Sequence, residues 1–293
     1  MMSRGDNLTR GQAFVIIATL LWPLQEAFGG MLMERHAAAQ VVALRYITHL
    51  LLLGLFVVPR YGLRVFATQR PGLQLLRGLC MFGMPAGFIL AASVTQVDWI
   101  WTIFWFMPAI ALIGAMLIMH ERPDLFARAA ALVAPLGAAA IWEASPGNLP
   151  GTAASLLMGA SFAGYIVLSR VLRDEKLFAS LFYTAVGALL PMCLFVWQVW
   201  TPVTAADIVP TLVTGVLSLF ILGTFDVAVD AAPVTVVAPI ISLALVWELV
   251  LRVLQHHSPV FAADLFGIVL ISMSCILYLS WHHVQVWRQR RSA

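Results

Sequence analysis

The chain has 293 residues, of which 61% are hydrophobic and only 11% are charged. A soluble globular domain carries about 25% charged residues, and these supply most of its water-facing surface. The composition therefore excludes a soluble enzyme, a disordered chain and a nucleic-acid-binding domain, and it predicts an integral membrane protein. Ten transmembrane helices of ~20 residues use ~200 positions, which leaves no room for a soluble catalytic domain.

Apolar runs between charged residues or Pro and Gly breaks predict an all-α fold of ten transmembrane helices. The basic N-terminus resembles a signal peptide, but the apolar run behind it is long and contains Gln25 and Glu26, so we interpret it as an uncleaved first span. Thr95 to Asp98 separate the third and fourth spans, because an unpaired Asp in lipid is costly. The expected spans cover residues 12–32, 38–58, 73–94, 99–119, 126–142, 150–172, 178–200, 208–229, 234–254 and 262–283.

Basic residues are distributed unevenly between the two sides of this predicted bundle. If the N-terminus is inside, most of the 17 Arg and Lys residues fall on inside segments. Basic residues favour the cytoplasmic side, so the chain is expected to be a multi-pass protein of the inner membrane with both termini in the cytoplasm. One connection fits less well, because the segment between the eighth and ninth spans carries Asp226 and Asp230 and no base.

The two halves of the sequence, 1–146 and 147–293, can be aligned with each other. Gly11 to Trp22 matches Gly151 to Phe162, and "MPAIALIGAMLIMHERP" in the fourth span matches "APIISLALVWELVLRVL" in the ninth. Each half has five helices, an odd number, so the second half enters the membrane from the opposite side. This predicts two inverted five-helix repeats, with a substrate site at the repeat interface near the membrane midplane.

The sequence resembles the EamA-like ten-helix members of the drug/metabolite transporter superfamily over residues 11–283. The resemblance is carried by Arg77-Gly78, "PAIALIGAMLIMHERP" (108–123), "GTAASLLMGASFAGYIVLSRVL" (151–172) and "APIISLALVWEL" (238–249). One departure is that the family often repeats the glutamate of Glu121 in the ninth helix, where this chain has Arg252, with Glu248 one turn earlier. The resemblance implies a secondary transporter, often an exporter of amino acids or related metabolites, with a cavity lined by helices 1, 3, 4, 6, 8 and 9.

Three ionisable residues lie inside predicted spans at a similar depth. At ~1.5 Å of rise per residue, Glu26, Arg45 and Glu248 all lie roughly 10 Å from the outer end of their helices. Burying such groups is costly, so they are expected to form a cluster that binds a zwitterionic or charged solute, with one carboxylate exchanging a proton. The alternative is two structural ion pairs, Glu26 with Arg45 and Glu248 with Arg252.

Other candidates surround this cluster. Pro23 weakens the first helix beside Trp22 and Gln25, which suits a binding site but is also compatible with an ordinary proline kink. His49 lies near the midplane, where it could relay protons or form a helix–helix hydrogen bond. The remaining candidates for the cavity wall are aromatic, with membrane-interface or core packing as the alternative: Trp101, Trp105, Phe162, Tyr165 and Trp247.

The sequence contains no phosphate-binding Gly loop, nucleophile motif or zinc-binding HExxH motif, so we expect neither an enzyme nor a bound cofactor or metal. The leading hypothesis is export of a small amino-acid-like or amphipathic metabolite by alternating access, coupled to protons or driven by the substrate gradient. A narrower version is export of an opine-type metallophore. Import or exchange of a nucleotide-derived or phosphorylated solute is an alternative, although Arg45 is the one clear intramembrane base. A third hypothesis is an intramembrane enzyme or a scaffold that does not transport. The expected partners are a small-molecule substrate and the lipid bilayer, in a monomer or homodimer without nucleic acid.

Overall fold

The computed structural model describes residues 4–142, 145–256 and 261–291, and within these ranges the secondary structure is entirely helical. The first half contains α1 (Arg4–Met33), α2 (Ala38–Leu52), the π-helical η1 (Leu53–Val57), α3 (Val58–Tyr61), the 3-10 turn η2 (Leu63–Phe66), α4 (Pro71–Ala92), α5 (Val97–Phe104), α6 (Met107–Met119) and α7 (Leu125–Trp142). The second half contains α8 (Leu149–Val171), α9 (Leu177–Val196), α10 (Ala205–Ala231), α11 (Val234–Ile241), α12 (Leu243–His256) and α13 (Ala262–Arg291).

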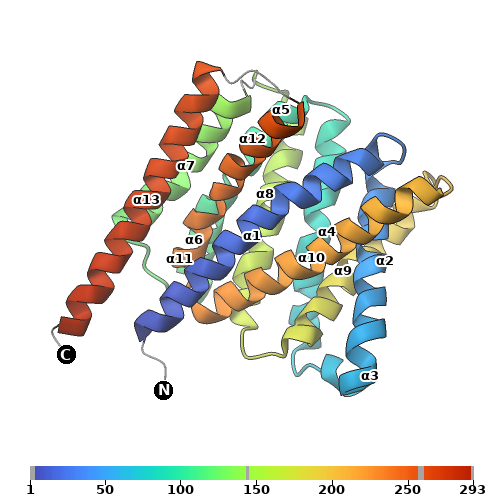
Figure 1. Ribbon diagram of the computed structural model, residues 1–293, viewed down its shortest axis with the longest axis horizontal. Helices are drawn as coiled ribbons and strands as arrows, with labels where there is room; N and C mark the ends of the chain where they lie inside the picture. The colour runs from blue at the N-terminus through green and yellow to red at the C-terminus, as the bar shows by residue number, and fades with distance from the viewer. Residues whose placement is uncertain (1–3, 143–144, 257–260, 292–293) are drawn as a thin grey trace.

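The described residues form 10 helical segments that are long and apolar enough to cross a membrane. Their bounds agree with the ten expected spans to within a few residues, so the prediction of a multi-pass, all-helical membrane protein is confirmed. α1 begins and α13 ends at the same edge of the molecule, which we call the terminal side (Figure 1). Since the spans alternate in direction, the α1–α2 and α4–α5 connections lie at the other end, which we call the opposite side.

Two spans expected to be continuous are interrupted. The fourth breaks between α5 and α6 at Trp105 and Phe106, two residues before Pro108, and the ninth breaks at Ser242, three residues after Pro239. Proline lacks a backbone N–H and clashes with the preceding turn, so both interruptions lie where the ladder of helical hydrogen bonds is weakest. By contrast, α1 runs through Pro23 as a single helix. Broken helices of this kind release backbone groups near the centre of a membrane protein.

Most of the close helix packing joins one half of the chain to the other. α1 lies along α10, α4 packs against α8 and α9, and α7 pairs with α13 at one edge of the molecule (Figure 1). The α4–α9 contact is close because it is made by glycines: a Cβ added to Gly78 would lie 2.6 Å from the Tyr183 carbonyl oxygen and 2.7 Å from the Cα of Gly187. Small residues allow membrane helices to approach in this way. The core therefore lies between the two halves.

Candidate functional site

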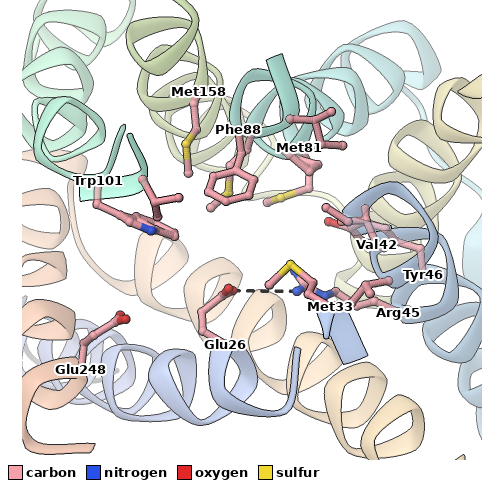
Figure 2. A pocket seen from close by; sticks show the side chains of 16 residues that line it. Glu26, Met33, Val42, Arg45, Tyr46, Met81, Phe88, Trp101, Met158 and Glu248 are labelled. Atoms are coloured by element: carbon pink, nitrogen blue, oxygen red, sulfur yellow. Dashed lines mark ion pairs between the residues drawn. The ribbon is translucent and has the colours of Figure 1, made fainter. Parts of the chain in front are cut away.

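A cavity of about 260 Å³ lies at the centre of this interface (Figure 2). Its volume is close to the ~300 Å³ at which small-molecule sites begin. Met33 and Val97 are 41% and 46% exposed and flank the α1–α2 and α4–α5 connections, so the cavity reaches the opposite side. The lining comes from α1, α2, α4, α5, α8 and α12: Glu26, Met33, Ala38, Val41, Val42, Arg45, Tyr46, Met81, Met84, Pro85, Phe88, Ile89, Val97, Trp101, Met158 and Glu248.

The three ionisable residues expected to form a cluster all line this cavity. Nη2 of Arg45 on α2 lies 3.8 Å from Oε1 of Glu26 on α1, and the Gln25 amide donates a hydrogen bond of 3.3 Å to the same Glu26 oxygen. The Arg45 and Glu26 side chains are 16% and 23% exposed. The ion pair considered as the structural alternative is therefore present, but it lies in the wall of a cavity and remains accessible from it.

Glu248 lies near Glu26 on the same side of the cavity and has a different environment (Figure 2). The alternative pair with Arg252 is absent from the described residues, because Arg252 instead forms an ion pair of 2.7 Å with Asp264 on α13. Its guanidinium also lies over the Trp142 ring, 5.5 Å from the centroid. Among the described residues Glu248 has neither an ion pair nor a hydrogen bond from its side chain. Its carboxylate is therefore available to interact with a molecule in the cavity.

The wall facing these charges is apolar and adaptable. Met81, Met84 and Met158 lie beside the ring pair of Phe88 and Trp101, whose centroids are 5.9 Å apart. Thioether side chains are flexible and polarisable, and they pack well against aromatic ligands. Trp101 was expected in the wall, whereas the methionines were not among the candidate residues. Methionine occurs throughout membrane helices, so nothing in the sequence distinguishes these three.

The cavity ends at a cluster of aromatic rings. A neighbouring space of about 40 Å³ is lined by Trp22, Gln25, Phe162 and Phe225, together with several residues of the main cavity. The Trp22 ring lies 5.0 Å from Phe162, 6.3 Å from Phe225 and 6.0 Å from Phe104, measured between centroids. We call Trp22, Phe104, Phe162 and Phe225 the aromatic plug. They come from α1, α5, α8 and α10, so both halves of the chain contribute to it.

Four other candidates do not line either cavity. Trp105 is buried behind Trp22, with ring centroids 6.3 Å apart, and Tyr165 lies on the far side of Phe162. The ring nitrogen of Trp247 is buried without a hydrogen-bond partner in the described structure. His49 is fully buried, and neither ring nitrogen has a partner there, so the helix–helix hydrogen bond considered for it is not formed.

Beneath the aromatic plug, on the terminal side, lies a buried ion pair that the sequence analysis missed. Arg77 on α4 is 3.2 Å from Asp226 on α10, and their side chains are 1% and 9% exposed. Arg77 also donates to Ser169, to Thr184 at 2.7 Å and to the Ser180 carbonyl. Tyr165 joins the pair, since its hydroxyl lies 3.4 Å from Asp226 and its ring 5.5 Å from the guanidinium.

Asp226 was counted with the connection between the eighth and ninth spans, although the expected span of 208–229 already includes it. The structure places it within α10, which extends to Ala231. The signals that could have identified the pair are an aspartate near one end of an apolar run and an arginine just inside the third span. Neither signal predicts the partner, which is 149 positions away in the sequence.

A second polar contact closes the terminal side. Glu121, which follows α6, accepts hydrogen bonds from the first two backbone N–H groups of α11, at 3.3 Å from Val234 and 2.9 Å from Thr235. It also lies 3.9 Å from Arg170 of α8, which donates to the carbonyl oxygens of Val229 and Asp230 in α10. Helix N-termini attract carboxylates in this way. The contact ties together α6, α8, α10 and α11.

At the other end of the molecule a polar cluster joins the α1–α2 connection to the start of α10. Asp207 lies 3.0 Å from Arg35 and 3.1 Å from His36, and it completes the capping box of α10 with Thr204. Arg35, His36 and Asp207 do not line the cavity, so this cluster is separate from the candidate site.

The comparisons with known proteins show a similarity of fold. No protein-family model and no curated protein matches the chain. One solved structure, described only as "Crystal structure of protein", superposes with a TM-score of 0.77 and covers 93% of this chain and 96% of that chain. The two sequences are 17% identical, so the likeness is one of fold alone. Nearly the whole chain thus adopts an arrangement that a second, distantly similar chain also adopts.

Proposed function

We propose that this protein is a secondary transporter that exports a small amino-acid-like or amphipathic metabolite by alternating access. The observation that carries the proposal is the cavity with Glu26, Arg45 and Glu248 in its wall, which is accessible from one side of the bundle and closed on the other. The closed side consists of the aromatic plug, the Arg77–Asp226 pair and the Glu121 contact, to which both halves contribute. A closed, removable barrier next to a binding cavity is what alternating access requires.

The helix packing supports the proposal of two inverted repeats, and the assignment to the EamA-like members of the drug/metabolite transporter superfamily rests on the sequence motifs alone. If the first five spans correspond to the last five in order, the α1–α10 contact corresponds to the α8–α4 contact, and α7–α13 corresponds to itself. The α2–α10 contact likewise corresponds to α9–α4. All of these are main contacts of the fold, as expected for two repeats related by a pseudo-two-fold axis.

The distribution of basic residues supports an orientation in the inner membrane of the cell in which the terminal side faces the cytoplasm. The connections on that side carry most of the Arg and Lys residues. With this orientation the cavity is open to the outside, in the state that releases an exported substrate. Reloading from the cytoplasm then requires separation of Arg77 from Asp226 and of Glu121 from the start of α11.

The test is substrate counterflow in proteoliposomes containing the purified protein, with candidate amino acids and amines as solutes. Glu26→Gln and Glu248→Gln are expected to lower the rate at least tenfold, and Glu34→Gln, an exposed glutamate outside the cavity, to leave it unchanged. Proton coupling predicts that an imposed pH gradient drives uptake or release. If both cavity variants transport at the rate and with the pH dependence of the unaltered protein, the proposed site is wrong.

A further inference from the structure

The charges of the cavity do not balance. The charged residues that line it are Glu26, Arg45 and Glu248, and one negative charge remains after the first two are paired. The neighbouring base, Arg252, is engaged by Asp264. An uncompensated carboxylate within a membrane span costs several kcal/mol unless a partner, a proton or water compensates it. A cation bound in the cavity would therefore be stabilised by Glu248, with which no described base forms a direct ion pair.

The rest of the lining favours an apolar or aromatic body next to that charge. The rings of Trp101 and Phe88 line the cavity, and Tyr46 lies beside Arg45. Aromatic rings attract cations through their negative faces, most strongly when water is excluded. Met81 and Met84 provide a deformable surface that accommodates different ring shapes.

A carboxylate on the bound molecule is disfavoured by the same arrangement. The one base of the lining, Arg45, already shares its guanidinium with Glu26 at 3.8 Å, and a second anion must compete for it. That anion also meets the uncompensated charge of Glu248 across a cavity of about 260 Å³. Repulsion between like charges at a few ångströms is large where the effective dielectric constant is low.

We propose that the substrate class is an amphipathic organic monocation, with its ammonium group between Glu248 and Glu26 and its apolar body against Trp101, Phe88 and the methionines. Glu248 is then the residue that selects for positive charge. This assignment deepens the proposed transport function and uses the same site. It specifies a positively charged substrate, whereas the sequence predicted a zwitterionic or charged solute.

The test measures binding separately from transport, with three probes that share a phenyl ring and a short chain. These are 2-phenylethylammonium, phenylalanine and 3-phenylpropionate, which at neutral pH carry charges of about +1, 0 and −1 respectively. Binding to the full-length protein in lipid nanodiscs is followed by calorimetry. The ammonium probe is expected to bind at least tenfold more tightly than the propionate, with phenylalanine between them.

Substitutions of Glu248 test whether this residue causes the preference for the positively charged probe. Glu248→Gln is expected to weaken binding of the ammonium probe at least tenfold and to leave binding of the propionate unchanged or stronger. Glu248→Asp retains the charge and is expected to keep the order of the three probes. Glu34→Gln is the matched control and is expected to bind as the unaltered protein does. An order that persists in Glu248→Gln, equal binding of all three probes, or no binding of the ammonium probe at millimolar concentration each overturns the assignment.

Transport and charge preference fail in distinguishable ways. If the ammonium probe binds as expected but no solute crosses the membrane in proteoliposomes, the cation site stands and the transport proposal fails. If the proteoliposomes transport all three probes at equal rates, transport stands and the selection for positive charge by Glu248 is refuted. If Glu248→Gln does not fold, the order of the three probes on the unaltered protein still decides the matter.

Discussion

Replacing Asp226 with asparagine tests the buried ion pair on the terminal side. Arg77 is 1% exposed at its side chain, so Asp226→Asn leaves a guanidinium without its counter-charge in a site that water does not reach. Removing one partner of a buried ion pair costs about 3–5 kcal/mol. Ser169, Thr184 and the Ser180 carbonyl continue to accept hydrogen bonds from Arg77, which places the expected loss at the lower end of that range.

A loss of about 3 kcal/mol lowers the folding equilibrium constant roughly 100-fold. The measurement is reversible unfolding in mixed detergent micelles, followed by tryptophan fluorescence. The matched control is Asp174→Asn, because Asp174 is 79% exposed at its side chain and lies 3.9 Å from Arg173. An exposed pair of this kind contributes about 0–1 kcal/mol, so the control is expected to unfold at nearly the same detergent fraction as the unaltered protein.

The double variant Arg77→Met with Asp226→Leu separates charge from packing. Apolar replacement of both partners of a buried pair is often neutral or stabilising, so this protein is expected to be more stable than Asp226→Asn. Two results contradict the reasoning. One is an Asp226→Asn protein as stable as the Asp174→Asn control, and the other is a double variant at least as unstable as the single one.

Three further changes are expected to alter stability in the same unfolding experiment. Gly78→Ala is expected to lower the free energy of unfolding by about 1–3 kcal/mol, because the added methyl group meets the backbone of α9. The control Gly223→Ala has open space around it and is expected to leave stability unchanged. Equal losses in the two variants contradict this packing. Phe162→Ala removes the centre of the aromatic plug and is expected to lower the free energy of unfolding by about 3–5 kcal/mol. The control Phe220→Ala changes a side chain that is 58% exposed, and its loss is expected to be much smaller. Similar losses in the two variants contradict a tightly packed aromatic plug. Glu121→Ala removes the cap of α11 and is expected to cost about 1–2 kcal/mol, and an unchanged midpoint argues against that role.

The sequence predicted the number and position of the spans because the membrane imposes a single length and a single polarity on each of them. It also placed Glu26, Arg45 and Glu248 at one depth, since the rise per residue of a helix is fixed. All three line one cavity. What it could not predict is the direction of each side chain around its helix. Trp101 faces the cavity while Trp105, one turn later, lies at the break between α5 and α6 and packs behind Trp22.

Long-range pairing was the other limit. Arg77 is one of several arginines near the ends of predicted helices, and such residues are normally interfacial. Asp226 lies near the end of an apolar run, where a connection is the simplest interpretation. Only the packing of α4 against α8 and α9, and of α8 against α10, brings the two together. The lack of a direct ion pair at Glu248 depends in the same way on Asp264, which forms the 2.7 Å ion pair with Arg252.

The difference between these two carboxylates bears on how the proposed transport cycle would work. Asp226 has its counter-charge within the protein, so the pair is stable while the terminal side is dry. Opening that side would admit water, and hydration would then compensate both charges, which makes their separation much less costly than removal of either partner. Glu248 has no ion-pair partner within 4 Å in the described structure, so a ligand, a proton or water from the cavity can compensate it. In the proposed cycle, paired charges would close the terminal side and the unpaired Glu248 would bind the substrate. On that proposal the apolar double variant is expected to restore stability to the barrier and to be unable to reopen it.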